Sequence, residues 1–197
     1  MISGIILAAG ASNRMGSSKA LLRIGDKTFL QQIVDVLRSA RILDIVIVIG
    51  AEADEIKKTL AWFDGKIVIN NNWEKGQITS VIAGLDNLSE EDLHGVMICP
   101  ADHPFISQAL IVDLLQGYWK SKKKIIIPTY EGIRGHPVIF SKELFGDLRT
   151  ASLDIGARSV VNRYVNDIHT VSVETEGILI NIDTPEDYQK YIISKNV

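Results

Sequence analysis

Residues 2–19 read ISGIILAAGASNRMGSSK, and this stretch decides the fold class. Its first part, Ile2–Ala8, is a short apolar run with β-branched residues, which is typical of a strand buried on both faces. The part that follows is rich in Gly, Ala and Ser and carries two basic side chains, Arg14 and Lys19. A buried strand that leads into such a loop predicts the first βα unit of an open parallel sheet, with a ligand beyond the carboxyl end of the strand.

Further apolar runs alternate with amphipathic segments along the chain. The segments at 28–41 and 107–123 have apolar residues at helical spacing, and Ser107 is suited to cap the second. The alternation predicts a Rossmann-like α/β fold with a mostly parallel central sheet and helices on both faces. The additional buried strands expected in this part are Ile45–Ile49, Lys66–Ile69, Val96–Cys99 and Lys124–Pro128.

Shorter elements are expected in the last third of the chain. The pattern predicts strands at His136–Phe140, Asp167–Val173 and Ile178–Ile182. Thr184-Pro185 followed by acidic residues predicts the start of a helix, because Thr caps and Pro suits the first helical position. Since no repeat or linker divides the sequence, we expect a single domain over residues 1–197.

The composition excludes several classes of protein. The chain has 197 residues, of which 46% are hydrophobic and 23% charged, and this mix argues against disorder. Its 21 basic and 24 acidic residues give a net charge of −3, which argues against nucleic-acid binding. Cys99 is the single cysteine, so neither an intrachain disulfide nor a multi-cysteine metal site is possible. The sequence starts without a basic, cleavable leader, and no apolar run reaches the length of a membrane span. We therefore expect a soluble cytoplasmic protein that binds neither nucleic acid nor a membrane.

The loop after the first strand is suited to bind an anion. Gly10 and Gly16 tolerate positive φ, and small side chains let backbone amides approach a polyphosphate, to which Arg14 and Lys19 add charge. The glycine spacing fits neither the Walker A loop nor the dinucleotide-binding fingerprint. From the residues alone, an ordinary Gly/Ser turn with both basic side chains in solvent remains the alternative.

Two carboxylates also follow expected strands. Asp102 lies between two prolines after the strand at 96–99, and Asp183 follows the strand expected at 178–182. Carboxylates at neighbouring strand ends, facing a basic loop, predict a Mg²⁺ site completed by water and substrate phosphates. The alternative is that each aspartate forms a turn or precedes a helix cap.

Two further loops stand out. Residues 70–80 lead into a helix whose N-terminal amides are suited to a ligand. His136, in Gly135-His136-Pro137, is suited to be a general base, a phosphate contact or a structural histidine, and its spacing slightly favours the last of these.

Taken together, these segments resemble the motifs of the MobA-like nucleotidyltransferases. The first loop resembles the family signature, and its Ala8-Ala9-Gly10 form is similar to the cytidylyl branch rather than to the guanylyl branch. The resemblance implies a nucleotide-diphospho-sugar transferase-like fold. It continues through Gly76-Gln77-x-x-Ser80, Pro100-Ala101-Asp102-x-Pro104, Gly135-His136-Pro137-Val138, Asp154-x-Gly156-Ala157-Arg158 and Asp183-Thr184-Pro185-Glu186-Asp187.

The resemblance implies an activity and its site. Members of the cytidylyl branch join the nucleotide of CTP to the phosphate of molybdopterin with Mg²⁺ and release pyrophosphate, which leaves a molybdoenzyme as a candidate partner. Arg14, Lys19 and Asp102 would be catalytic, and Asp102 with Asp183 would hold the metal. His136, Asp154 and Arg158 would contact the second substrate. The residues that would contact the nucleotide are Leu7, Ala8, Ala9, Gly10, Ser12, Gln77, Ser80, Pro100 and Ala101.

Three positions depart from the family pattern. His103 stands where relatives usually have Gln, Leu153 where they usually have Gly, and Asn181 where they often have Asp. The first two bear on substrate contacts, and the third on the number of carboxylates at the metal.

Two other functions are compatible with the same residues. One is cytidylyl or guanylyl transfer to a sugar or polyol phosphate by an enzyme of the same fold. The other is a non-catalytic accessory protein that binds the molybdenum cofactor and hands it on. The presence of Lys19, Asp102 and Asp183 argues against the accessory role, because a protein that only binds the cofactor needs no metal site for phosphate transfer.

Overall fold

The computed structural model describes residues 1–89 and 91–194. At its centre is an eight-stranded sheet in the order β10-β7-β9-β6-β1-β4-β5, with β8 paired to β7. Strands β5, β4, β1 and β6 are parallel, whereas β9 is antiparallel to both β6 and β7. The strands are β1 (Ile2–Ala8), β4 (Ile45–Ile49), β5 (Lys66–Ile69), β6 (Gly95–Pro100), β7 (Ile125–Tyr130), β8 (Ile133–Arg134), β9 (Val138–Ser141) and β10 (Ile168–Ser172), and a separate hairpin pairs β2 (Arg23–Ile24) with β3 (Lys27–Thr28).

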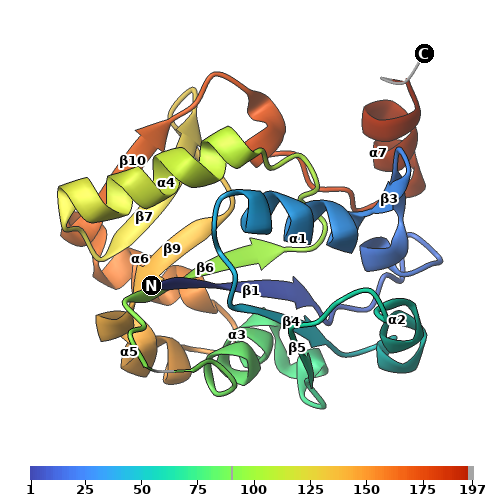
Figure 1. Cartoon of the computed structure of the whole chain (residues 1–197), viewed down its shortest axis with the longest axis horizontal. Coiled ribbons are helices and arrows are strands. Elements are labelled where there is room, and N and C mark those ends of the chain that lie inside the picture. The colour runs from blue at the N-terminus through green and yellow to red at the C-terminus, as the bar shows by residue number, and fades with distance from the viewer. Residues whose placement is uncertain (90, 195–197) are drawn as a thin grey trace.

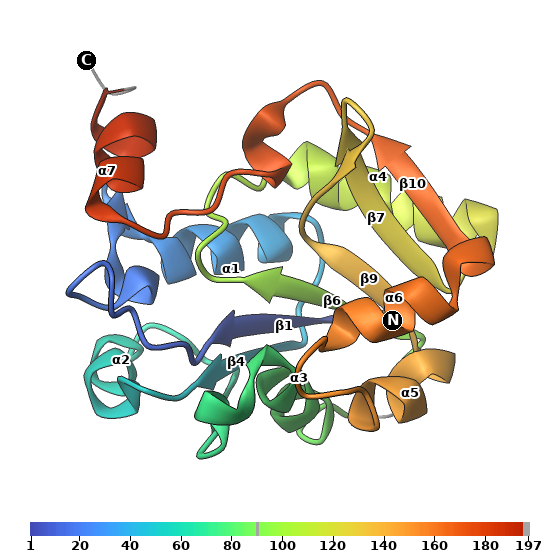
Figure 2. The same ribbon diagram turned by 180° about the vertical axis from the view of Figure 1, so that it is seen from behind.

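Helices cover both faces of the sheet, which confirms the expected α/β class. Helices α1 and α4 lie on the face seen in Figure 1, and α3, α5 and α6 lie on the face seen in Figure 2. The α-helices are α1 (Phe29–Ser39), α2 (Ala53–Thr59), α3 (Gln77–Leu85), α4 (Gln108–Ser121), α5 (Phe145–Arg149), α6 (Ala157–Arg163) and α7 (Pro185–Tyr188). Short 3₁₀ helices lie at η1 (Lys19–Leu21), η2 (Trp73–Lys75), η3 (Lys142–Leu144), η4 (Val165–Asp167) and η5 (Glu176–Ile178), and a π-helical turn, η6 (Gln189–Ile193), continues α7.

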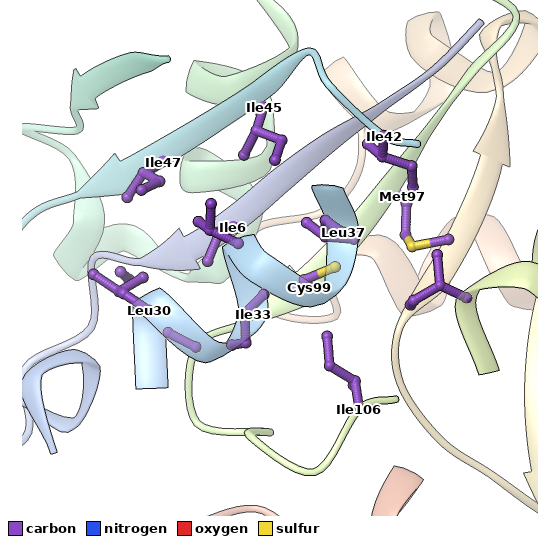
Figure 3. Close-up of a cluster of buried hydrophobic side chains, with 14 of the residues drawn as sticks. Ile6, Leu30, Ile33, Leu37, Ile42, Ile45, Ile47, Met97, Cys99 and Ile106 are labelled. Atoms are coloured by element: carbon purple, nitrogen blue, oxygen red, sulfur yellow. The ribbon is translucent and has the colours of Figure 1, made fainter. Parts of the chain in front are cut away.

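Strand β1 is buried on both faces, as its composition predicts. Ile6 packs with the residues of α1 and α4, whereas Ile5 and Leu7 pack with those of α3, because successive side chains of a strand point to opposite faces. Figure 3 shows Ile6 among Leu30 and Ile33 of α1, with strand β4 alongside. The carboxyl end of β1 is thereby fixed in the middle of the molecule.

The helix starts expected from the sequence are confirmed. Thr28 caps α1 and forms a reciprocal capping box with Gln31. Ser107 caps α4 through the amide of Leu110, and Thr184 forms a capping box with Asp187 ahead of α7. Each such cap contributes about 1 kcal/mol to the stability of its helix.

Two expectations about strands are wrong. The segment Lys66–Ile69 is a strand but not a buried one, because it forms the edge of the sheet and exposes Lys66 and Ile69. The segment 178–182 is not a strand. Ile180 and Ile182 pack with Phe29 and the C-terminal helical segment, whereas Ile178 packs in the core on the sheet. Burial and not strand pairing therefore explains the apolar run.

None of the described helices is long and apolar enough to cross a membrane.

Candidate active site

A cavity of about 180 Å³ lies at the carboxyl ends of β1 and β6. Every residue that the sequence assigned to the nucleotide lines this cavity, and so do Lys19 and Asp102. The lining is formed by Leu7, Ala8, Ala9, Gly10, Ala11, Ser12, Ser18, Lys19, Ala20, Trp73, Gln77, Ser80, Pro100, Ala101 and Asp102. The structure therefore brings segments far apart in the sequence to one pocket beyond the strand ends, where open parallel sheets bind their ligands.

Strand pairing sets the relative positions of these loops. Leu7 and Pro100 are partners across β1 and β6, and the amide of Ala101 donates a hydrogen bond to the carbonyl of Leu7 at 3.0 Å. On the other side of β1, the amide of Ala51 donates to the carbonyl of Ala9 at 3.0 Å. The segments that follow these three strands thus leave the sheet side by side, and those after β1 and β6 line the pocket.

Ser12 organises the loop after β1. Its hydroxyl accepts a hydrogen bond from the amide of Lys19 at 2.9 Å, and its carbonyl accepts from the amides of Met15 and Gly16. Gly16 has a φ of +72°, as expected for a glycine of such a loop, whereas Gly10 is not in the left-handed region. The loop thus folds on itself around Ser12 and presents the side chain of Lys19 to the pocket.

The wall formed by α3 depends on Gly76. This residue has a φ of +115°, and a Cβ atom there would lie 2.8 Å from the carbonyl oxygen of Leu153. Behind this wall, the amide nitrogen of Asn70 donates to the hydroxyls of Thr79 and Ser80 at 2.8 and 2.9 Å. Ser80 is therefore held in place by a buried polar partner.

Lys19 joins the two carboxylates that the sequence singled out. Its ammonium donates to Oδ1 of Asp183 and lies 3.6 Å from Oδ2 of Asp102. The guanidinium of Arg14 donates to Oδ2 of Asp183 at 3.2 Å from a largely exposed position. Asp102 and Asp183 thus converge on one cation position, although Asp183 does not follow a strand.

The charge of this cluster lowers the pKa of Asp183. Partial burial of the carboxyl alone would raise its pKa, but the hydrogen bond and charge of Lys19, together with the charge of Arg14, bring it below the usual value. Asn181 adds a further donor, since its amide lies 2.9 Å from Oδ2 of Asp183. Asn181 therefore orients this carboxylate in place of supplying another one.

The donor set fits a hard divalent cation that takes most of its ligands from elsewhere. Two carboxylates face the position now held by an ammonium ion, so the site accepts positive charge. Among the described residues, no group of three or more His, Cys, Asp or Glu side chains is placed to hold a metal. Mg²⁺ commonly binds in this way, through one or two carboxylates plus water and substrate phosphates.

Two histidines lie behind Asp102. The rings of His103 and His136 are 4.8 Å apart, and Nε2 of His103 lies 3.9 Å from Oδ1 of Asp102. Burial lowers the pKa of both imidazoles, to about 4 for His136, so both are neutral at pH 7. Neither buried Nδ1 atom has a hydrogen-bond partner.

None of the three residues expected at the second substrate lines this pocket, and they come from two separate segments. His136 lies beside His103, whereas Asp154 and Arg158 are exposed near the loop that packs on Gly76. Trp73 is a pocket residue that the sequence did not single out, although it lies within the 70–80 loop. The sequence placed Trp73 in a loop ahead of a helix, but its residue type did not indicate a ligand contact.

The fold and the pocket define a nucleotidyltransferase. The chain belongs to the MobA-like NTP transferase family, whose model matches residues 4–168. It is 28% identical over 191 residues to the molybdenum cofactor cytidylyltransferase of Escherichia coli, covering 95% of this chain and 93% of that protein. It is 32% identical over 192 residues to the molybdenum cofactor guanylyltransferase of Rhodopseudomonas palustris, covering 93% and 87%.

Solved structures show the same fold. The crystal structure of Rv0371c from Mycobacterium tuberculosis superimposes with a TM-score of 0.85 at 26% identity and covers 98% of this chain and 97% of that one. A structure of Rv0371c in complex with manganese gives a TM-score of 0.79 at 23% identity, with 98% of each chain covered.

Proposed function

We propose that the protein transfers the cytidylyl group of CTP to the terminal phosphate of a molybdopterin-type acceptor, with Mg²⁺ as the cofactor. The observation that carries this proposal is the convergence of Lys19, Asp102 and Asp183 at the mouth of the pocket that the first loop lines. The relatives that act on the molybdenum cofactor, named above, supply the acceptor class.

In this reaction a phosphate oxygen of the acceptor attacks the α-phosphorus of CTP. The new P–O bond forms as the bond to the β-phosphate oxygen breaks, and pyrophosphate leaves. A phosphate monoester is already an anionic nucleophile near neutral pH, so the protein needs to position and neutralise charge rather than move protons.

The pocket residues divide this work between them. The loop around Ser12 and the side chain of Arg14 hold the triphosphate, and Lys19 neutralises charge at the α-phosphate. Gln77, Ser80 and the backbone at Pro100–Ala101 contact base and ribose, and His136, Asp154 and Arg158 contact the acceptor. Asp102 and Asp183 would hold Mg²⁺, which supplies charge neutralisation at the phosphates when bound. The manganese complex of the mycobacterial relative supports a divalent ion.

The preference for CTP over GTP rests on Ala9. Ala9 is buried and lines the pocket, and a Cβ atom at Gly50 would lie 2.8 Å from its methyl group. The loop backbone is therefore packed tightly here and has little room to move aside for a purine. The relative from R. palustris makes guanylyl transfer the competing candidate.

The test is pyrophosphate release from CTP, measured with and without molybdopterin and with and without Mg²⁺. We expect release that requires all three components. Release from GTP at equal or greater kcat/KM would overturn the nucleotide preference, and binding of the acceptor without any release would favour the accessory role.

A further inference from the structure

We infer that the ammonium of Lys19 occupies the divalent-cation position of the free protein, so that the metal ion binds tightly only together with the nucleotide. The inference rests on the proposed function, since it assigns Asp102 and Asp183 to the metal and Lys19 to the phosphates. It adds an order of binding. The Lys19 ammonium occupies the metal position before the nucleotide binds, and it moves to the phosphates when metal and nucleotide bind.

The geometry shows one cation shared by two carboxylates. The Lys19 ammonium contacts Asp183 and lies 3.6 Å from Asp102. The exposed fractions of the three side chains are 18%, 23% and 27%, so the cluster is mostly shielded from water. In such surroundings the attraction between opposite charges is stronger than at an open surface.

The two carboxylates are fixed more firmly than the ammonium. The amide of Ile182 donates to the carbonyl of Asp102 at 2.9 Å and so ties the two segments together. Asp187 accepts a hydrogen bond from the amide of Asp183 at 3.1 Å. By contrast, the Lys19 side chain reaches the cluster through a flexible four-carbon stem. It is therefore the component that can leave while the carboxylates stay.

The Lys19 ammonium in this position disfavours binding of a divalent ion in the absence of nucleotide. A metal entering between Asp102 and Asp183 must displace the Lys19 ammonium, and the protein alone offers only these two carboxylates in return. A nucleotide favours metal binding in two ways, because its phosphates bind the displaced ammonium and also supply ligands to the ion. Metal and nucleotide should therefore strengthen each other's binding, by the same factor in both directions.

The experiment measures Mn²⁺ binding directly, from the electron paramagnetic resonance signal of the free ion, without nucleotide or acceptor. Lys19→Met removes the ammonium and leaves the two carboxylates facing each other. We expect it to bind Mn²⁺ roughly tenfold or more tightly than the wild type, a change within the usual range of coupling between sites. Lys19→Gln should show the same gain, which guards against a misfolded single variant.

Three controls isolate the cause. Lys124→Met removes a half-buried lysine that pairs with Glu143 at 2.8 Å, and it should bind Mn²⁺ like the wild type. Arg14→Met should give a smaller gain, because Arg14 contacts Asp183 alone and is 68% exposed. Adding Asp183→Asn to Lys19→Met should abolish the gain.

Unchanged or weaker Mn²⁺ binding by both Lys19 variants would overturn the inference. This outcome is separable from failure of the proposed function. If the wild type releases pyrophosphate from CTP and the variants gain no affinity, only the place-holding role of Lys19 is wrong. If the variants gain affinity while the wild type acts on no nucleotide, the cation position stands and the transferase proposal is wrong.

Discussion

The amide of Ile182 donates a hydrogen bond to the carbonyl of Asp102 at 2.9 Å, and this bond joins the loop after β6 to the segment ahead of α7. The chain around Ile182 is not a strand, yet the bond brings Asp183 to the side of Asp102 as strand pairing would. The convergence of the two carboxylates on Lys19 follows from it.

Replacing either carboxylate by an amide should reduce turnover by orders of magnitude. Asp102→Asn and Asp183→Asn each remove a charge that we assign to the metal, and loss of a preorganised electrostatic contact typically costs about 3 kcal/mol in the barrier. The readout is pyrophosphate release under saturating Mg²⁺, with thermal unfolding to show that the fold is retained. Asp113→Asn, on the exposed side of α4, is the matched control. Near-normal turnover in both site variants would refute the metal assignment.

Lys19→Ala should lower kcat more than it raises KM for the nucleotide. The reason is that Lys19 is placed to neutralise charge that grows at the α-phosphate in the transition state, and such interactions act mainly on kcat. Steady-state kinetics over a range of CTP concentrations separates the two constants. A change confined to KM would show that Lys19 binds only the ground state.

Several of these features could be predicted from the sequence, because they depend on local patterns. Runs of β-branched residues predicted β1 and β4 with their bounds, and Ser107 and Thr184 predicted helix starts. The apolar stripe over 28–41 predicted α1. Other features depend on tertiary partners that no local pattern encodes.

The apolar segment 178–182 illustrates the limit. A buried strand and a buried irregular segment have the same composition, and only the packing of Ile180 and Ile182 against Phe29 distinguishes them. The contact between His103 and His136 likewise joins residues whose spacing carries no signal. In the pocket, the loops were predictable because each follows a strand, whereas Trp73 was not, because its neighbours become visible only in the fold.

The protein should lose stability as the pH falls from 6.5 towards 4, in part through His136. In the folded protein burial lowers the pKa of His136 from 6.5 to about 4, while the unfolded chain takes up this proton near pH 6.5. Between these values the unfolded state binds more protons, so the free energy of unfolding decreases, by about 2 kcal/mol at pH 5 for this residue alone. Urea denaturation at pH 8 and pH 5 measures the decrease.

His136→Gln provides the comparison for this pH dependence. It removes the titrating group and should reduce the difference in stability between pH 8 and pH 5 by about the same 2 kcal/mol. An identical pH dependence in the variant and the wild type would show that His136 is not a neutral buried residue in the folded state.

Gly76→Ala should destabilise the protein and disturb the pocket. Its φ of +115° is strained for any residue with a side chain, and the new methyl group would meet the carbonyl of Leu153 at 2.8 Å. We expect a loss of about 1–3 kcal/mol in the free energy of unfolding. Gly146→Ala is the matched control, because Gly146 lies within α5 and an added Cβ atom meets nothing within 4 Å. Equal stability of the two variants would contradict the tight approach of the 153 loop to α3.

Cytidylyl transfer is tested by following the α-phosphorus of the nucleotide. CTP radiolabelled at that atom is incubated with the protein, Mg²⁺ and molybdopterin, beside GTP and ATP labelled in the same way. We expect label to move from CTP into the acceptor as a cytidylyl group, with kcat/KM for CTP tens- to thousands-fold above that for GTP, or about 2–4 kcal/mol. Transfer from GTP at an equal or higher kcat/KM, or no transfer of label to the acceptor from any nucleotide, would contradict it.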